Sequence, residues 1–156
     1  ELARLLPRFL EIYEANAARL TRPYPGVRDT LAELRRAGYA TAIATNKPQR
    51  ASEAVLAALG LAELFDAVAG GDRFPTRKPD PGHLLGVIAL LGGDRARSAM
   101  IGDNENDVAA ARAASLPVLL MRHGYARLDL ESLQPDALLD GFADLPEALE
   151  RLGLVP

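Results

Sequence analysis

The sequence has 156 residues, of which 49% are hydrophobic and 25% are charged, values typical of one soluble globular domain. The net charge of −3 argues against a nucleic-acid partner, because such proteins usually carry a basic excess. The absence of cysteine excludes disulfides and zinc–sulfur sites, and two histidines are too few for a multi-histidine metal site. No apolar run approaches the roughly 20 residues that cross a bilayer, and we expect a cytoplasmic protein.

The first 20 residues have apolar side chains at helical spacing, which predicts an amphipathic helix that ends near Thr21. Residues 22–26, Arg-Pro-Tyr-Pro-Gly, form a stiff linker, because each proline fixes its own φ and biases the residue before it towards extended geometry. We therefore divide the chain into residues 1–22, a helix and linker, and residues 23–156, the core.

Helices and strands alternate beyond the linker. The expected helices cover about 27–37, 48–59, 81–91 and 106–114, with a last helix opened by Asp144, and the expected strands cover 39–45, 67–69, 98–101, 117–121 and 137–139. Gly38 and Gly60 follow the first two helices and suit left-handed caps. Strands separated by single helices indicate βαβ units, so we expect an α/β fold with a doubly wound parallel sheet covered on both faces.

Polar residues follow three of these strands, at the sheet edge where functional residues of open α/β sheets gather. They are Thr45-Asn46-Lys47, Arg77-Lys78-Pro79-Asp80-Pro81 and Gly102-Asp103-Asn104-Glu105-Asn106-Asp107. We expect the three sets to converge, which would bring together a hydroxyl, an amide, a lysine and paired carboxylates. This combination fits a phosphate ester beside a hard cation, because carboxylates select Mg²⁺ and lysine brings positive charge to phosphate oxygens.

Each set also has a simpler interpretation. Thr45 and Asn46 alone are more often a helix cap, Lys78 alone is more often a solvated lysine, and the acidic run alone could cap a helix. The acidic run also resembles the start of a calcium loop, but its sixth and twelfth positions are Val108 and Ala114 rather than glycine and glutamate, which excludes an EF-hand. The three sets together, each after its own strand, favour a functional site.

Three motifs resemble the second, third and fourth motifs of haloacid dehalogenase-like phosphatases. They are Thr45-Asn46-Lys47-Pro48, Lys78-Pro79-Asp80-Pro81 and Gly102-Asp103-Asn104-Glu105-Asn106-Asp107. Within this superfamily the closest resemblance is to bacterial phosphoglycolate phosphatases. Three further segments are similar to that family: residues 22–27, Gly70-Gly71-Asp72 and Gly124-Tyr125. The resemblance implies a Rossmann-like core, and it implies that residues 1–20 are the last helix of a cap that closes over the substrate.

The resemblance further implies a role for five residues. Thr45 and Asn46 would bind the transferring phosphoryl group, Lys78 would stabilise its charge, Asp103 would ligate Mg²⁺, and Asp107 would support the site. The implied reaction is magnesium-dependent hydrolysis of a small phosphomonoester, with 2-phosphoglycolate as the expected substrate. A sugar-phosphate phosphatase, a phosphoglucomutase-like enzyme and a pyrophosphatase remain alternatives, because the cap decides among substrates. We expect no nucleic-acid or membrane partner.

The resemblance also implies a strand that ends in Asp-x-Asp-Gly-Thr, whose first aspartate attacks phosphorus and whose second acts as general acid and base. No Asp-x-Asp occurs in this sequence, and we expect that strand upstream of Glu1 in the natural protein. The alternative is a phosphate- or metal-binding domain without turnover. In the family this strand lies between those that end here at Thr45 and Ile101, so we expect these two strands not to pair with each other.

Overall fold

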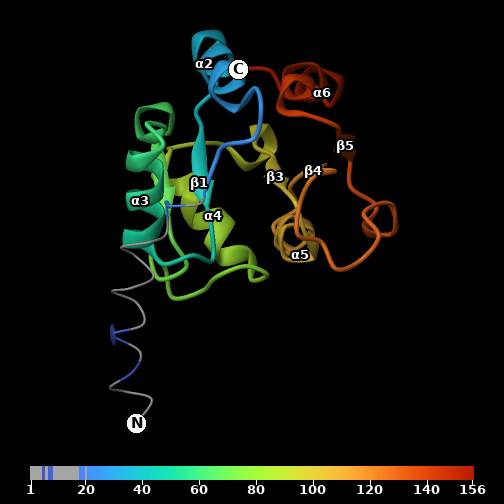
Figure 1. Cartoon of the computed structure of the whole chain (residues 1–156). Coiled ribbons are helices and arrows are strands. Elements are labelled where there is room, and N and C mark those ends of the chain that lie inside the picture. Colours follow the sequence, from blue (N-terminus) through green and yellow to red (C-terminus); the bar gives the residue numbers. More distant parts are fainter. Residues whose placement is uncertain (1–4, 6, 9–17, 20) are drawn as a thin grey trace.

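The computed structural model describes residues 5, 7, 8, 18, 19 and 21–156 (Figure 1). The expected helix over residues 1–20 lies largely outside the described residues. Helices and strands alternate from residue 27 onward, as expected. They are α2 (Val27–Ala37), β1 (Ala42–Ala44), α3 (Gln49–Ala58), β2 (Ala67–Ala69), α4 (Pro81–Leu90), β3 (Met100–Gly102), α5 (Glu105–Ala113), β4 (Val118–Met121), β5 (Ala137–Leu139) and α6 (Leu145–Arg151), with short 3-10 turns between some of them.

The strands form two parallel sheets, one of β1 and β2 and one in the order β3-β4-β5. Ile43 lies opposite Val68 in the first sheet, and Ile101 lies opposite Leu119 in the second. β1 and β3 do not pair with each other, as expected for strands that flank an absent one. The α/β class, with parallel strands and flanking helices, is therefore confirmed, and its strands are divided between two sheets.

The central strand β4 shows how helices cover both faces of the larger sheet. Val118, Leu119 and Leu120 have no exposed surface. Val118 and Leu120 belong to an apolar cluster formed mainly with α5, whereas Leu119 belongs to a second cluster formed with α2 and α6. This continuous apolar run is what a strand buried on both faces requires.

The smaller sheet has its own core. Leu31 of α2 and Leu56 of α3 are buried in a cluster against which Ile43 of β1 and Val68 of β2 pack. The two halves of the molecule meet where α4 contacts α5 and where α2 contacts α6. In Figure 1 β1 and its helices α3 and α4 lie on one side, and β3, β4 and β5 lie on the other.

The ends of the elements follow local chemistry. Gly38 ends α2 in the left-handed conformation with φ 98°, as expected, and its N–H bonds to carbonyls of the last turn. β1 is shorter than the expected 39–45, because the N–H of Thr41 donates to the carboxylate of Asp66 (2.9 Å) instead of to a strand carbonyl. Within the described part of the chain, none of the helices is both long and apolar enough to cross a membrane.

His83 of α4 is completely buried beneath β2. Its Nε2 lies 3.2 Å from the carbonyl oxygen of Ala69, its Nδ1 has no hydrogen-bond partner, and its ring meets Phe74 edge-on at 5.7 Å between centroids. Burial lowers the pKa of His83, and the charge of Lys78 acts in the same direction, although the Ala69 carbonyl opposes both. The folded protein therefore favours neutral His83.

We expect the free energy of unfolding to fall as the pH drops below about 6.5, the pKa of an unperturbed histidine. In this window the unfolded chain binds a proton on His83 that the folded chain does not, and the cost is about 1.4 kcal/mol per pH unit down to the folded-state pKa. Urea unfolding between pH 5 and 7 measures the slope. His83→Leu should flatten it, whereas substituting the exposed His123 in the same way should not. An unchanged slope in His83→Leu would contradict the assignment.

Candidate functional site

A pocket of about 230 Å³ lies where β1 and β3 end. It is lined by Thr45, Asn46, Lys47, Lys78, Asp103, Asn104, Asn106 and Asp107. The structure thus brings together residues from all three motifs, including the five to which the resemblance gave roles. Strand ends deliver two of the motifs, and the loop between β2 and α4 delivers Lys78, so the convergence follows from the parallel topology.

Lys78 and Asp107 form a buried ion pair in this pocket. The Lys78 Nζ lies 2.6 Å from Asp107 Oδ1, and the two side chains are 9% and 4% exposed. A buried charge without a partner is costly, so each residue fixes the other. Lys78 is therefore not a solvated surface lysine. Its ammonium group is held at a defined place in the pocket.

The second carboxylate oxygen of Asp107 organises the loop before α5. It accepts hydrogen bonds from the N–H groups of Asp103 (3.0 Å) and Asn104 (3.3 Å). Asn104 Oδ1 in turn accepts a bond from the N–H of Asn106 (2.9 Å), and Asn104 and Asp107 form a capping box at the start of α5. The simpler interpretation of the acidic run as a helix cap is thus also correct. Asp107 holds both Lys78 and the backbone that carries Asp103.

Asn46 and Thr45 contact the backbone around the pocket. Asn46 Nδ2 donates to the carbonyl oxygen of Lys78 (2.7 Å), so this side chain, expected to bind a phosphoryl group, also fixes the loop of Lys78. Thr45 Oγ1 accepts from the N–H of Lys47 (3.2 Å), which leaves the hydroxyl proton available for a ligand. The phosphate-binding roles of both residues stay predictions.

The loops after β1 and β2 are held against each other. The N–H of Gly71 donates to the carbonyl of Lys47 (2.8 Å), and the N–H of Gln49 donates to the carboxylate of Asp72 (2.7 Å). A Cβ atom at Gly71 would lie 2.4 Å from the carbonyl oxygen of Asn46, so this approach requires glycine. The sequence marks this contact only by Gly-Gly-Asp after a strand.

Asp103 is the acidic side chain in the pocket that is not engaged with Lys78. Its Oδ1 accepts from Asn104 Nδ2 (2.7 Å), and its Oδ2 accepts from the N–H of Tyr125 (3.2 Å). Among the described residues, no three acidic or histidine side chains gather closely enough to hold a metal. Mg²⁺ typically takes one or two carboxylates together with waters and substrate phosphate. Asp103 therefore fits as one ligand of a magnesium site.

The linker passes near the pocket, which the sequence did not indicate. Burial raises the pKa of Tyr24, and the nearby Tyr125 and Asp103 raise it further. Both tyrosines are exposed, Tyr24 at 44% and Tyr125 at 84%. The two tyrosines thus lie in the electrostatic neighbourhood of Asp103 while remaining open to solvent.

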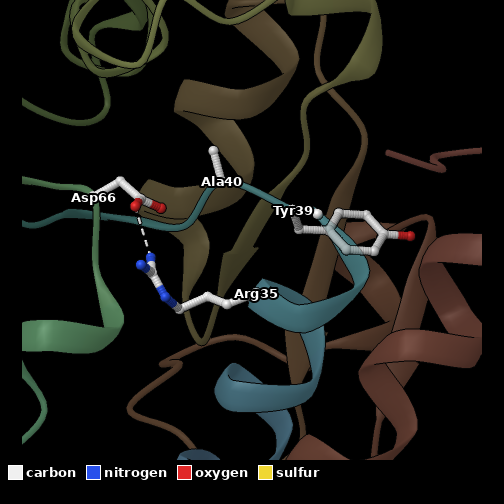
Figure 2. Close-up of a pocket in the computed structure, with 5 residues that line it drawn as sticks. Arg35, Tyr39, Ala40 and Asp66 are labelled. Carbon is white, nitrogen blue, oxygen red and sulfur yellow. Dashed lines mark hydrogen bonds and ion pairs between the residues drawn. The ribbon is translucent and has the colours of Figure 1, made fainter.

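A second hollow, of about 270 Å³, lies at the opposite edge, where β1 and β2 begin, and is lined by Arg35, Gly38, Tyr39, Ala40 and Asp66. Figure 2 shows Arg35 reaching Asp66, at 2.7 Å, while the ring of Tyr39 points away from them. Hydrogen bonding from the N–H of Thr41, and then from Arg35, lowers the pKa of Asp66. The charged groups of this hollow are paired with each other, so we do not regard the hollow as the active site.

Comparison with known proteins gives consistent results. A family model for haloacid dehalogenase-like hydrolases matches residues 2–115. A phosphoglycolate phosphatase of Mesorhizobium japonicum is 44% identical over 150 residues, which cover 96% of this chain and 66% of the relative. The chain thus spans about two thirds of the length of the curated relatives that it matches.

Two solved structures have similar folds. One is a predicted phosphoglycolate phosphatase from Haemophilus somnus, 32% identical, with a TM-score of 0.85 over 90% of this chain and 63% of that one. The other is CbbY from Rhodobacter sphaeroides in complex with phosphate, 30% identical, with a TM-score of 0.83 over 96% of this chain and 68% of that one.

Proposed function

This chain belongs to the haloacid dehalogenase-like hydrolase family, and from that premise we propose that it forms the core of a magnesium-dependent phosphatase. The proposed reaction converts 2-phosphoglycolate and water into glycolate and phosphate. The observation that carries the proposal is the convergence of Thr45, Lys78 and Asp103 in one pocket. The names of the similar proteins support the substrate, and the absence of cysteine supports a cytoplasmic location.

Each residue of the pocket has a proposed task. Thr45 donates its hydroxyl to a phosphate oxygen, and the ammonium group of Lys78 stabilises the negative charge that develops there. Asp107 keeps that ammonium group in place through the 2.6 Å contact. Asp103 supplies an oxygen ligand to Mg²⁺. The bound cation would neutralise phosphate charge.

The nucleophile is proposed to come from a segment before Glu1 that carries Asp-x-Asp. Its first aspartate displaces glycolate from phosphorus, forming an aspartyl-phosphate, and the second protonates the departing oxygen. Water then attacks the phosphorus of the aspartyl-phosphate, which releases phosphate and regenerates the aspartate. The greater length of the relatives supports such a segment. The lack of pairing between β1 and β3, whose ends meet at the pocket, supports a place for its strand.

The proposal is tested with a full-length protein that includes the upstream segment. We expect phosphate release from 2-phosphoglycolate with Mg²⁺, and loss of activity when a chelator removes the metal. If the protein preferred a hexose phosphate by about a hundredfold or more in kcat/KM, equal to roughly 2.7 kcal/mol, the assignment of 2-phosphoglycolate would be wrong, but the assignment as a phosphatase would stand. Binding of inorganic phosphate without turnover of either ester would favour a regulatory domain instead.

A further inference from the structure

The segment after β4 lies with its backbone against the loop that carries Asp103. The N–H of Tyr125 donates to Asp103 Oδ2 (3.2 Å), and the N–H of Arg127 donates to Glu105 Oε2 (3.3 Å). Tyr125 is 84% exposed, and its main-chain N–H, rather than its ring, makes this contact. Two carboxylates, one in the loop after β3 and one in the first turn of α5, thus hold the segment 124–127 beside the pocket.

Gly124 makes this approach possible. A Cβ atom at position 124 would lie 2.4 Å from the Cβ of Asp103, 2.8 Å from its backbone oxygen and 3.0 Å from Oδ2. Carbon atoms in favourable contact lie about 3.5–4.0 Å apart, so no side chain fits there. Because Gly124 is exposed, the loop can move outward without disturbing the core. Either that movement or a displaced Asp103 would break the contact with Tyr125.

We propose that Gly124 is a positioning residue for Asp103. Because Gly124 has no side chain, the backbone of residues 124 and 125 can contact Asp103. The N–H of Tyr125 then holds one carboxylate oxygen of Asp103, which orients this carboxylate for binding a divalent cation. Hydrogen-bond partners that orient a metal ligand are typically worth about 10–100-fold in metal affinity. This inference rests on the proposed function, in which Asp103 binds Mg²⁺.

The test measures Mn²⁺ binding to the full-length protein by electron paramagnetic resonance, with Mn²⁺ as the probe for Mg²⁺. Gly124→Ala should raise the Kd for Mn²⁺ by about 10–100-fold. Gly141→Ala is the matched control, because Gly141 has extended backbone and nothing lies within 4 Å of its Cβ position. Tyr125→Ala keeps the N–H and should bind Mn²⁺ as the wild type does, whereas Tyr125→Pro removes the donor and should bind weakly.

A second measurement, made without metal, separates this inference from the proposed function. Amide hydrogen exchange at Tyr125 should be faster in Gly124→Ala and in Asp103→Ala than in the wild type, with melting temperatures of Gly124→Ala and Gly141→Ala close to each other. Unchanged exchange, or wild-type Mn²⁺ affinity in Gly124→Ala, would overturn the positioning role. The expected exchange differences together with no Mn²⁺ binding by the wild type would overturn the metal site itself.

Discussion

Replacing Lys78 with alanine should lower kcat of the full-length protein by more than about a hundredfold, because charge-stabilising groups in a preorganised site are typically worth roughly 3–4 kcal/mol. The same change should also reduce the free energy of unfolding. It leaves the carboxylate of Asp107, 4% exposed, buried without its partner. Breaking a buried ion pair in this way costs about 3–5 kcal/mol. Phosphate release and urea unfolding measure the two effects.

A double variant separates these two effects. Lys78→Met with Asp107→Asn removes both buried charges, while the asparagine oxygen can still accept the N–H groups of Asp103 and Asn104. We expect most of the lost stability to return without any activity. Glu63→Gln is the control for an exposed pair, since Glu63 and Arg28 are 65% and 52% exposed, and it should leave the free energy of unfolding nearly unchanged. Near-wild-type kcat in Lys78→Ala would remove Lys78 from the catalytic machinery.

Asp103→Asn should lower kcat by more than about a hundredfold and raise the Mg²⁺ concentration needed for half-maximal rate, because the amide carries no charge for the cation. The substitution preserves shape, and its oxygen can still accept the N–H of Tyr125, so only the bond from the partly exposed Asn104 amide is lost. Stability should therefore change little. A titration of the rate with Mg²⁺ measures the effect.

Two neighbouring substitutions provide the scale for Asp103→Asn. Glu105→Gln alters a carboxylate in the first turn of α5 that does not line the pocket, and we expect its rate to stay within a few-fold of wild type. Asp107→Asn should cost about 10–100-fold, as expected for a residue that acts by orienting another. If Asp103→Asn and Glu105→Gln behaved alike, Asp103 would not be the metal ligand.

Much of the fold could be predicted from local sequence. The bounds of α2 were predicted to the residue, because its apolar spacing is regular and Gly38 ends it. β2 was also predicted correctly, whereas β1 was predicted too long. The residues before Ala42 are mostly apolar and so suit a strand. Only the fold places the carboxylate of Asp66 where it accepts the N–H of Thr41.

The sequence was enough to predict which residues line the pocket, but not which hydrogen bonds they make. Thr45 and Asp103 each follow a strand, so the parallel topology brings their positions together. The bond from Asn46 to the carbonyl of Lys78 joins residues 32 apart, and that from Tyr125 to Asp103 joins residues 22 apart. Such contacts depend on how loops lie against each other, which neither periodicity nor local propensity encodes.

The division of the strands between two sheets has a consequence for cooperativity. The two sheets share no ladder of paired strands, and α2 contributes Leu34 to one cluster and Leu31 to the other, so side-chain packing rather than sheet hydrogen bonding joins the two halves. The pocket lies between the two halves. Lys78 belongs to the half with the smaller sheet and Asp107 to the other, and the bond from Asn46 holds the Lys78 loop within its own half. Separation of the halves would therefore dismantle the pocket before either sheet unfolds. A phosphate that contacted both halves would oppose that separation by mass action, because it binds only while the pocket is assembled.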